Sequence, residues 1–366
     1  MKQWFRNTGR YVGYTLLWVL VAIVVVWGAM SARAHRKAQL ITELNIGVER
    51  SSEHQLVDAP MMNDWLLSHT ESPVGRPLSE VNLAELERVA LQHSAVAEAN
   101  AYSTFSGSVE ISVAQHEPVA RLKVDGYDMY LTADGYLFPA SDGYAAHVPV
   151  ITGSYRPIFR PNYAGYATTV VRDSIASLDS VIMALEQQKL PHHKLRQEYR
   201  QDLRRVVNER IRRTLFMSEY EYDKRNEELK ERKARARKEN VARNKSIDAA
   251  IRALDAEQDV VRERQKRLEV IDYDFERLLY FIERVRQSEF WSSEVVQIVL
   301  EGGGTKPMEI AFVPRSGRFL VDMGFTDRLG DKLSMLRRFY DDGLDNIGWS
   351  KYRRISLRYE GQVVCR

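Results

Sequence analysis

The longest segment of this chain without a helix breaker runs from His192 to Glu301, where 110 residues include neither glycine nor proline. Such a composition is typical of long exposed helices. Residues 194–270 hold 23 Lys+Arg against 16 Asp+Glu, a local charge of +7, whereas the whole chain of 366 residues has a formal charge of +3. The basic character is therefore regional, and the total charge indicates no anionic partner for the chain as a whole.

Apolar residues in this segment repeat at helical spacing. Positions 247–268 step by four and three, a heptad seam that Gln258 and Gln265 interrupt. Upstream, apolar residues follow every fourth position over 195–215. We expect the chain to return to a sheet that begins before this segment, so the two stripes favour a long antiparallel helical hairpin over 169–287. A single straight rod also fits the pattern.

The bend of the hairpin is expected in residues 226–246, which are charged and poor in apolar side chains. Residues 230–245 include eight Lys or Arg. A solvated bend explains this cluster, and a surface for anionic lipid headgroups or envelope polymers is the alternative. We expect no nucleic acid partner, because no aromatic residue interleaves the cluster.

A membrane segment is expected near the start. Residues 11–30 form an uncharged run of 20 residues, long enough as a helix to cross a hydrocarbon core of roughly 30 Å. A cleaved signal peptide is the alternative, but its apolar region usually spans only about 7–15 residues. The flanking charges are balanced, and a short tail before a single span usually stays in the cytoplasm. We expect a cytoplasmic tail at 1–10, one transmembrane helix at 11–30, and residues 31–366 on the outer side of the membrane.

Residues 31–117 have the pattern of a small α+β domain. Val109, Ile111 and Val113 occupy alternate positions, as a half-buried strand requires. The expected order is β-α-α-β-β: a strand at 41–48, helices capped by Asp58 and Asn82, and strands at 96–103 and 108–116.

A mixed β domain is expected on both sides of the hairpin, at 118–168 and 288–366. Asp-Gly-Tyr occurs at 125–127, 134–136 and 142–144, and Asp-Gly favours tight hairpin turns. The second part has strands at 295–300 and 308–313, a helix capped by Asp327 and a last strand at 355–359. The fold class is therefore α+β: a single transmembrane helix, the β-α-α-β-β domain, and a β domain interrupted by the hairpin.

No motif indicates catalysis. Neither H-E-x-x-H nor G-x-S-x-G occurs, and no serine is followed three residues later by lysine. Cys365 is the only cysteine, so an internal disulfide and a cysteine-based zinc site are excluded. We expect no enzyme activity, no cofactor and no metal.

Phrases in both halves of the β domain resemble one protein family. The β-α-α-β-β module after a membrane anchor resembles a POTRA domain, and residues 117–122 (EPVARL), 134–139 (DGYLFP) and 147–153 (HVPVITG) resemble the Bacteroidetes branch of the FtsQ/DivIB cell-division proteins. The resemblance continues at 348–352 (GWSKY) and 355–364 (ISLRYEGQVV). Typical members have only a short helical connection, so residues of about 182–270 resemble an insertion.

The resemblance implies a function and a site. In the family, the last strand of the sheet is an edge on which an FtsB/DivIC-like partner adds a strand, and an unpaired edge offers N–H and C=O groups for this purpose. The implied role is a scaffold of the divisome that binds FtsB/DivIC-like and FtsL-like proteins and links early and late division proteins to septal peptidoglycan synthesis. Other divisome proteins would bind the transmembrane helix and the POTRA domain. The partner-binding residues expected here are Ile355, Leu357, Arg358, Tyr359, Glu360, Gly361 and Val363.

Two other classes remain open at this point. A periplasmic adaptor of an efflux or secretion system also combines a membrane anchor, β domains and a coiled-coil hairpin, but it flanks the hairpin with paired lipoyl-like halves. A membrane-tethered cell-wall enzyme is the third class, and no motif supports it.

Overall fold

The structure is a computed structural model that describes residues 18–28, 30–31, 38–49, 55–140, 145–303, 306–344, 348–349 and 351–366. The chain forms two compact units. Unit 1 consists of Met1–Ile151 and Pro161–Gly165, and unit 2 consists of Thr152–Arg160 and Tyr166–Arg366. Unit 1 therefore includes the first strands of the expected β domain, and unit 2 includes the helical hairpin together with the later strands.

The first described residues are helical. Residues 18–28 form an α-helix with exposed side chains. Across the described part of the chain, no helix combines the length and apolarity needed to cross a membrane. The expected tail at 1–10 and residues 11–17 of the expected span lie outside the described residues.

Unit 1 begins with a POTRA-like arrangement. Its elements are β1 (Leu44–Val48), α2 (Ala59–His69), α3 (Leu83–Ala90), β2 (Val96–Ser103) and β3 (Val109–Gln115). The order β-α-α-β-β agrees with the prediction. Strand β3 lies in the middle of the sheet, parallel to β1 and antiparallel to β2. Asp58 caps α2 as expected, because its Oδ1 accepts a 2.7 Å hydrogen bond from the Met61 N–H.

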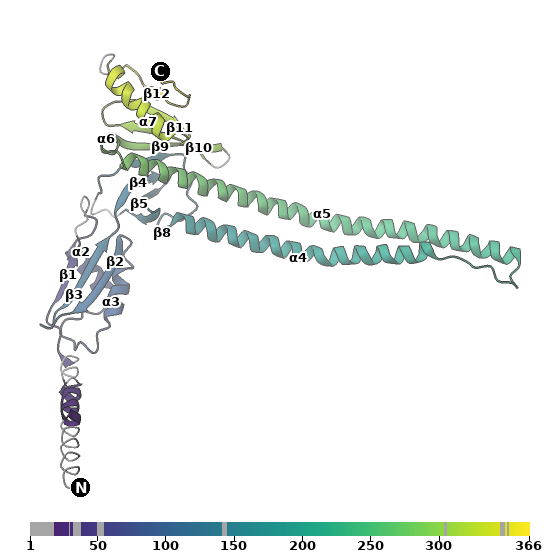
Figure 1. The fold of residues 1–366 in the computed structure, drawn as a ribbon, viewed down its shortest axis with the longest axis horizontal. Coiled ribbons are helices and arrows are strands. Elements are labelled where there is room, and N and C mark those ends of the chain that lie inside the picture. The colour runs from purple at the N-terminus through teal and green to yellow at the C-terminus, as the bar shows by residue number, and fades with distance from the viewer. Residues whose placement is uncertain are drawn as a thin grey trace, which may run out of the picture. The chain divides into compact units, whose positions relative to one another are not determined.

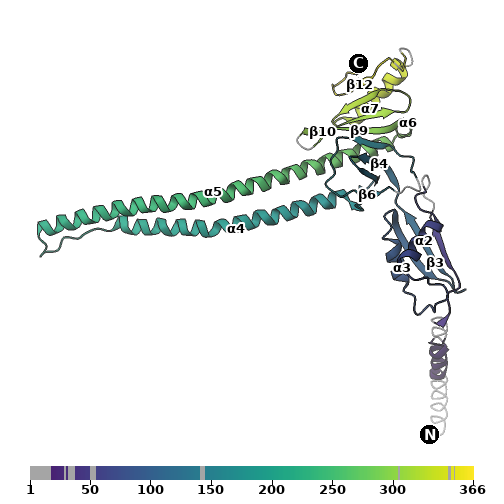
Figure 2. The ribbon, with the colours of Figure 1, turned by 180° about the vertical axis from the view of Figure 1, so that it is seen from behind.

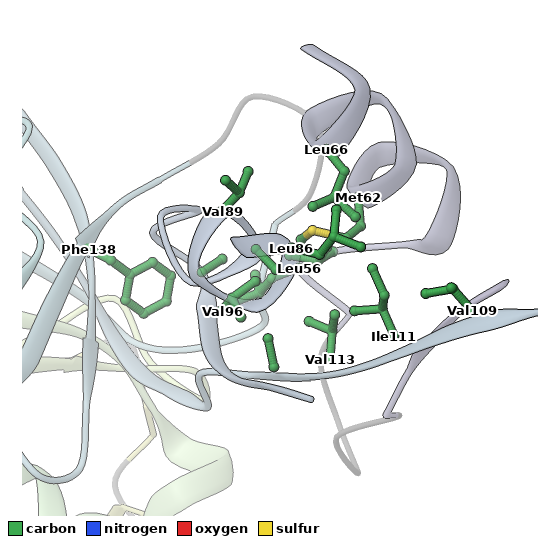
Figure 3. Packing of buried hydrophobic residues seen from close by; sticks show 14 of the residues in the cluster. Leu56, Met62, Leu66, Leu86, Val89, Val96, Val109, Ile111, Val113 and Phe138 are labelled. Carbon is green, nitrogen blue, oxygen red and sulfur yellow. The ribbon is translucent and has the colours of Figure 1, made fainter. Parts of the chain in front are cut away.

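The core of unit 1 lies between the two helices and the sheet (Figure 3). Val109, Ile111 and Val113 of β3 are almost fully buried, which confirms the predicted alternation. Residues of α2 and α3 cover them, and Figure 3 shows Met62 and Leu86 facing the strand. Tyr130 and Phe138, which follow the POTRA-like elements in the chain, belong to the same buried cluster.

The rest of unit 1 is a meander of short strands: β4 (Pro118–Val124), β5 (Tyr127–Thr132), β6 (Tyr136–Pro139) and the beginning of β7 (Val150–Gly153). Strands β4, β5 and β6 pair antiparallel in sequence. Asp125 and Gly126 turn the chain with positive φ values of 45° and 85°, so the first Asp-Gly-Tyr phrase makes a tight turn as predicted. The third phrase, at 142–144, lies outside the described residues.

Unit 2 contains two long helices that follow β8 (Gly165–Tyr166): α4 (Ala167–Asn208) and α5 (Glu219–Arg286). The helices lie side by side and antiparallel (Figures 1 and 2). Arg196 Nη1 lies 3.5 Å from Asp248 Oδ1, and Asn240 Nδ2 donates to the Tyr199 carbonyl over 2.8 Å. These contacts define the register of the hairpin.

A buried lysine interrupts the apolar seam of the hairpin. Lys189 of α4 is 5% exposed, and its Nζ lies 2.6 Å from Asp255 Oδ1 and 2.5 Å from Gln258 Oε1 of α5. The hydrogen bond to Asp255 raises the pKa of Lys189, although burial opposes the shift. A polar group buried at a seam position favours one register, because other registers leave it without partners.

One helix of the hairpin contains a proline, and the bend differs from the prediction. Pro191 lies at an interior position of α4. The ring removes the N–H that would bind the Gln187 carbonyl, and Gln187 is exposed, so water can solvate that carbonyl. The bend was expected at 226–246, but the helices are joined by residues 209–218.

The remainder of unit 2 consists of a β-sheet and short helices. Its elements are α6 (Glu289–Glu294), β9 (Val295–Gly303), β10 (Lys306–Pro314), β11 (Leu320–Gly324), α7 (Leu329–Arg338), the π-helix η1 (Phe339–Leu344), β12 (Arg354–Ser356) and β13 (Val364–Cys365). Strands β9, β10 and β11 pair antiparallel in sequence, and β12 is parallel to β11. The helix expected after Asp327 is α7, but its N-cap is Arg328 in a left-handed conformation.

The hairpin and the sheet share a core. Phe281 of α5 is fully buried, and its ring centroid lies 6.2 Å from that of Phe312 in β10. Nearby, Arg277 Nη1 donates to the Met308 carbonyl over 3.0 Å and to Asp274 Oδ1 over 3.4 Å. Burial raises the pKa of Asp274, and its hydrogen bonds oppose this shift. The base of α5 is thus anchored to β10 by apolar packing and by hydrogen bonds that the buried Arg277–Asp274 pair of α5 makes with the Met308 backbone.

Candidate functional site

The last strands of unit 2 differ from the expected open edge. Strand β12 pairs with β11 on one side and with β13 on the other, and Ile355 lies opposite both Val321 and Cys365. The prediction that Ile355 lies on an unpaired strand is therefore wrong. Strand β13, which has two residues, follows the turn at 359–362 and pairs with β12. It occupies the edge that was expected to be open.

Strand β13 is the outermost described strand at this end of the sheet. Arg354 and Arg366 exchange backbone hydrogen bonds, with N···O distances of 3.1 Å and 2.9 Å. In an antiparallel pair the hydrogen-bonded and non-bonded residues alternate. Cys365, opposite Ile355, is a non-bonded position, so its N–H and C=O groups point away from β12. Val363 is two residues earlier and has the same orientation in an extended chain.

One face of this sheet end carries a cluster of alternating charges. The side chain of Asp322 in β11 is only 5% exposed, and its Oδ2 accepts from Arg354 Nη2 over 3.1 Å and from Arg358 Nε over 2.7 Å. Glu301 of β9 and Glu309 of β10 pair with the same arginines, at 3.1 Å from Arg354 and 2.5 Å from Arg358. These five residues, called the charge ladder below, join four strands.

The carboxylates of the charge ladder further stabilise the charged form of its arginines. The hydrogen bond to Asp322 raises the pKa of Arg358, and burial opposes this shift. For Arg354, burial acts to lower the pKa, but Glu301 and Asp322 more than offset it and the pKa is raised. Charge-assisted hydrogen bonds to a nearly buried carboxylate are stronger than neutral ones, so the ladder fixes the position of the chain after β12.

The turn after β12 is exposed. Tyr359 is 59% exposed. Glu360 Oε1 lies 2.5 Å from Arg328 Nη1, and its side chain is 81% exposed. Gly361 has a φ of 67°, a left-handed conformation that glycine adopts without strain. Next to the turn, a depression of about 270 Å³ is lined by Asp322, Arg354, Ser356, Arg358, Tyr359, Val364 and Arg366.

The structure separates the predicted site residues into three groups. Ile355 and Leu357 are fully buried on the core face and offer no side chain to a partner. Arg358 belongs to the charge ladder. Tyr359, Glu360 and Gly361 are exposed, and Val363 is half-buried. The sequence reasoning missed Asp322, Arg354, Val364, Cys365 and Arg366, because a strand of two residues has no periodicity and the charge ladder depends on strand register.

The described residues of this site have the features of a binding surface. Among the described residues, no three His, Cys, Asp or Glu side chains come together in a way that could hold a metal ion. Burial raises the pKa of the Cys365 thiol, which keeps it in its less reactive protonated form at neutral pH. The site offers outward backbone groups, an exposed tyrosine and a polar depression, which are the features of a surface that captures a strand.

Two family models match the chain. A model described as FtsQ/DivIB, C-terminal related, matches residues 254–366 and so covers the end of α5 and the whole charge ladder. A POTRA-like domain model matches residues 39–114, the domain built around β3. No individual curated protein matches. The two matches together support an FtsQ/DivIB family protein, and members of that family are membrane-associated cell-division scaffolds and not enzymes.

Proposed function

We propose that this protein is a single-pass divisome scaffold that captures an FtsB/DivIC-like protein, together with an FtsL-like protein, at the β13 end of its sheet. The observation that supports the proposal most is the outward orientation of the Cys365 backbone groups on the outermost described strand. A partner strand that pairs with β13 would satisfy these groups and extend the sheet.

Addition to β13 differs from the strand addition expected at Ile355. The backbone of Ile355 is already bonded within the chain, so a partner at that position would first have to displace β13. Pairing with the outer side of β13 breaks none of the hydrogen bonds that the described residues make at this end of the sheet. The depression beside Tyr359 and Val364 then receives side chains of the partner and gives specificity.

Fixed geometry at this end of the sheet favours binding. The charge ladder holds Arg358, the residue before Tyr359, against β11. A surface that is already ordered loses little conformational entropy when a partner binds. Tyr359 is exposed on this ordered turn and is therefore suited to anchor a partner. Tyrosines are enriched among the residues that contribute most of the binding energy at protein interfaces.

The membrane topology is part of the proposal. Residues 11–30 would anchor the chain in the inner membrane with residues 1–10 in the cytoplasm, and both units would lie in the periplasm at the division septum. The POTRA-like domain and the membrane segment would bind further division proteins. A role as an efflux or secretion adaptor is less favoured, because an FtsQ/DivIB protein accounts for both matched family models.

Localisation with depletion tests the proposed function. A fluorescent fusion to the full chain is expected to form rings at mid-cell, and depletion of the protein is expected to give filamentous cells. Uniform distribution around the envelope with normal cell length after depletion would contradict a role as a divisome scaffold.

A further inference from the structure

The charge of the hairpin is distributed unequally along its length. The half distant from the sheet, residues 194–245, has 18 Lys+Arg against 10 Asp+Glu, a net charge of +8. The half next to the sheet, residues 167–193 and 246–286, has 10 Lys+Arg against 13 Asp+Glu, a net charge of −3. Even if every acid in the distant half pairs with a base, eight positive charges remain without a partner of opposite sign in that half.

Basic residues of this half lie along one face of α4, where Arg196 also pairs with Asp248 of the other half. Arg196, Arg200 and Arg204 follow at intervals of four residues, and with His193, Gln197 and Gln201 they line a polar depression of about 430 Å³. Residues four apart lie on the same side of a helix. The face is therefore a basic strip that leads along α4 towards the connection at 209–218.

The connection itself presents apolar side chains to solvent. The Met217 N–H donates to the Thr214 carbonyl over 3.1 Å, which closes a turn with Leu215 and Phe216 at its centre. Both side chains are 100% exposed, and nearby Tyr220 is 78% exposed. The central positions of turns favour Gly, Pro, Asn, Asp and Ser, so a Leu-Phe pair is unfavourable there unless another surface covers it.

Basic residues flank this turn. Arg210, Arg212 and Arg213 precede it and are exposed, and the Arg213 guanidinium lies 6.0 Å from the centre of the Tyr222 ring. Glu219 and Glu221 follow the turn and lie in the first turn of α5. Negative charges are favourable at this position because they interact with the positive end of the helix dipole. The net positive charge at the connection end of the hairpin therefore comes from these arginines and from the basic residues of α4 and α5.

We propose that the hairpin turn inserts Leu215 and Phe216 into an anionic lipid bilayer, with the basic half of the hairpin facing the headgroups. Apolar side chains at the apex with arginines behind them match the two layers of a bilayer surface, which are acyl chains below and anionic headgroups above. Helix α5 has 68 residues and is about 100 Å long, so the turn reaches a membrane far from the sheet to which its base is anchored. This inference is independent of partner capture at β13.

Depth-dependent fluorescence quenching tests the proposal on the full chain. Cys365 is replaced by serine, and Thr214 by cysteine carrying an environment-sensitive fluorophore. The protein is reconstituted in vesicles and mixed with further vesicles, and brominated lipids are placed in one population at a time. In vesicles of phosphatidylglycerol and phosphatidylcholine, we expect brominated lipids in one of the two vesicle populations to quench the fluorophore. This quenching should be lost at high salt. With phosphatidylcholine alone, quenching should be about tenfold weaker.

A matched pair of variants identifies the residues responsible. The double variant Leu215→Ser and Phe216→Ser should lower the fraction of quenched protein by about tenfold, because it removes both inserted side chains. The control Met183→Ser and Val260→Ser removes two side chains that are 65% and 70% exposed in the half next to the sheet, and it should leave quenching unchanged. Circular dichroism should show the same helix content in all variants.

Three results would overturn the proposal. The first is the lack of quenching in either lipid mixture, which would leave a protein partner as the occupant of the turn. The second is equal quenching with and without phosphatidylglycerol, which would remove the role of the basic half. The third is quenching that persists in the Leu215 and Phe216 double variant.

Discussion

Arg358 Nε lies 2.7 Å from Oδ2 of Asp322, a carboxylate whose side chain is only 5% exposed. This ion pair connects the exposed turn after β12 with the interior of the sheet. The same carboxylate also binds Arg354, so one buried acid positions two arginines of the proposed partner-binding end.

Removing this acid should destabilise the end of the sheet. Asp322→Ala leaves Arg354 and Arg358 close together without their shared buried partner, and we expect the free energy of unfolding of unit 2 to fall by about 2–3 kcal/mol. Urea denaturation followed by near-ultraviolet circular dichroism measures the change. In the control Glu360→Ala, the lost ion pair with Arg328 is at an 81% exposed side chain, so the cost should stay below about 1 kcal/mol. Equal costs for the two variants would show that the charge ladder has no special role.

Backbone donors of β13 should matter for partner binding. Cys365→Pro removes an N–H that points away from β12, and the preceding Val364 is already in a strand, where a following proline is tolerated. We expect binding of an FtsB/DivIC-like protein to weaken about fivefold to tenfold. Cys365→Ala keeps the N–H and should bind normally in the same titration. If both variants bind like the unchanged chain, pairing at this position does not occur.

The exposed tyrosine should contribute to affinity and little to stability. Tyr359→Ala removes a side chain that is 59% exposed, and we expect about tenfold weaker partner binding with an unchanged unfolding midpoint. Tyr359→Phe retains the ring and should retain most of the affinity. A loss of stability in Tyr359→Ala that equals its loss of binding would instead indicate a packing role.

Unit 1 should lose stability in mild acid. Burial lowers the pKa of His116, partly opposed by Asp134, and its ring stacks on Tyr136 at a centroid distance of 4.2 Å. Because the folded pKa lies below the unfolded value of 6.5, the unfolded chain binds more protons, and stability falls as pH drops below 6.5. Thermal unfolding between pH 7 and 5 measures this, using about the range in which histidine titrates.

The matched variant for this pH dependence is His116→Phe, which keeps the stacking and removes the titrating group. We expect a smaller loss of stability in acid than in the unchanged chain. His93, whose pKa burial also lowers, should account for part of the remaining slope. An unchanged slope in His116→Phe would show that His116 does not contribute.

A deletion within the hairpin should be tolerated only if it keeps the register between α4 and α5. Arg196 and Asp248 face each other, so deletion of residues 197–247 with a short turn leaves matched arms and an intact Lys189 contact with Asp255. Deletion of 194–270 leaves residues 167–193 opposite 271–286 and removes both α5 partners of Lys189. We expect the first deletion to preserve cooperative unfolding of the sheet and the second to lower its midpoint. Similar midpoints would show that register within the hairpin is not important.

Local signals predicted the POTRA-like domain well. The cap at Asp58 and the alternation of Val109, Ile111 and Val113 depend on neighbouring residues alone, and both are present. The bend of the hairpin was misplaced because residues 226–246 are good helix formers despite their charge, whereas 209–218 contain neither glycine nor proline to mark a break.

The candidate site was predicted only in outline. Tyr359, Glu360 and Gly361 are exposed as a binding turn requires, but Ile355 is paired on both sides. The charge ladder joins residues 53 and 36 positions apart, Glu301 with Arg354 and Asp322 with Arg358, through strand pairing. No local pattern reports such pairing, because it is fixed by register between strands.

Cross-linking through Cys365 tests strand capture at β13 most directly, because this residue is the only cysteine of the chain. Cysteines are introduced one at a time along an FtsB/DivIC-like partner, and disulfide formation is measured at mildly alkaline pH, since burial raises the pKa of the Cys365 thiol. Side chains of an added strand alternate between the two faces of the sheet, so the account predicts cross-links at every second position of one short partner segment. Cross-links that recur every three or four positions, or none along the whole partner, would contradict it.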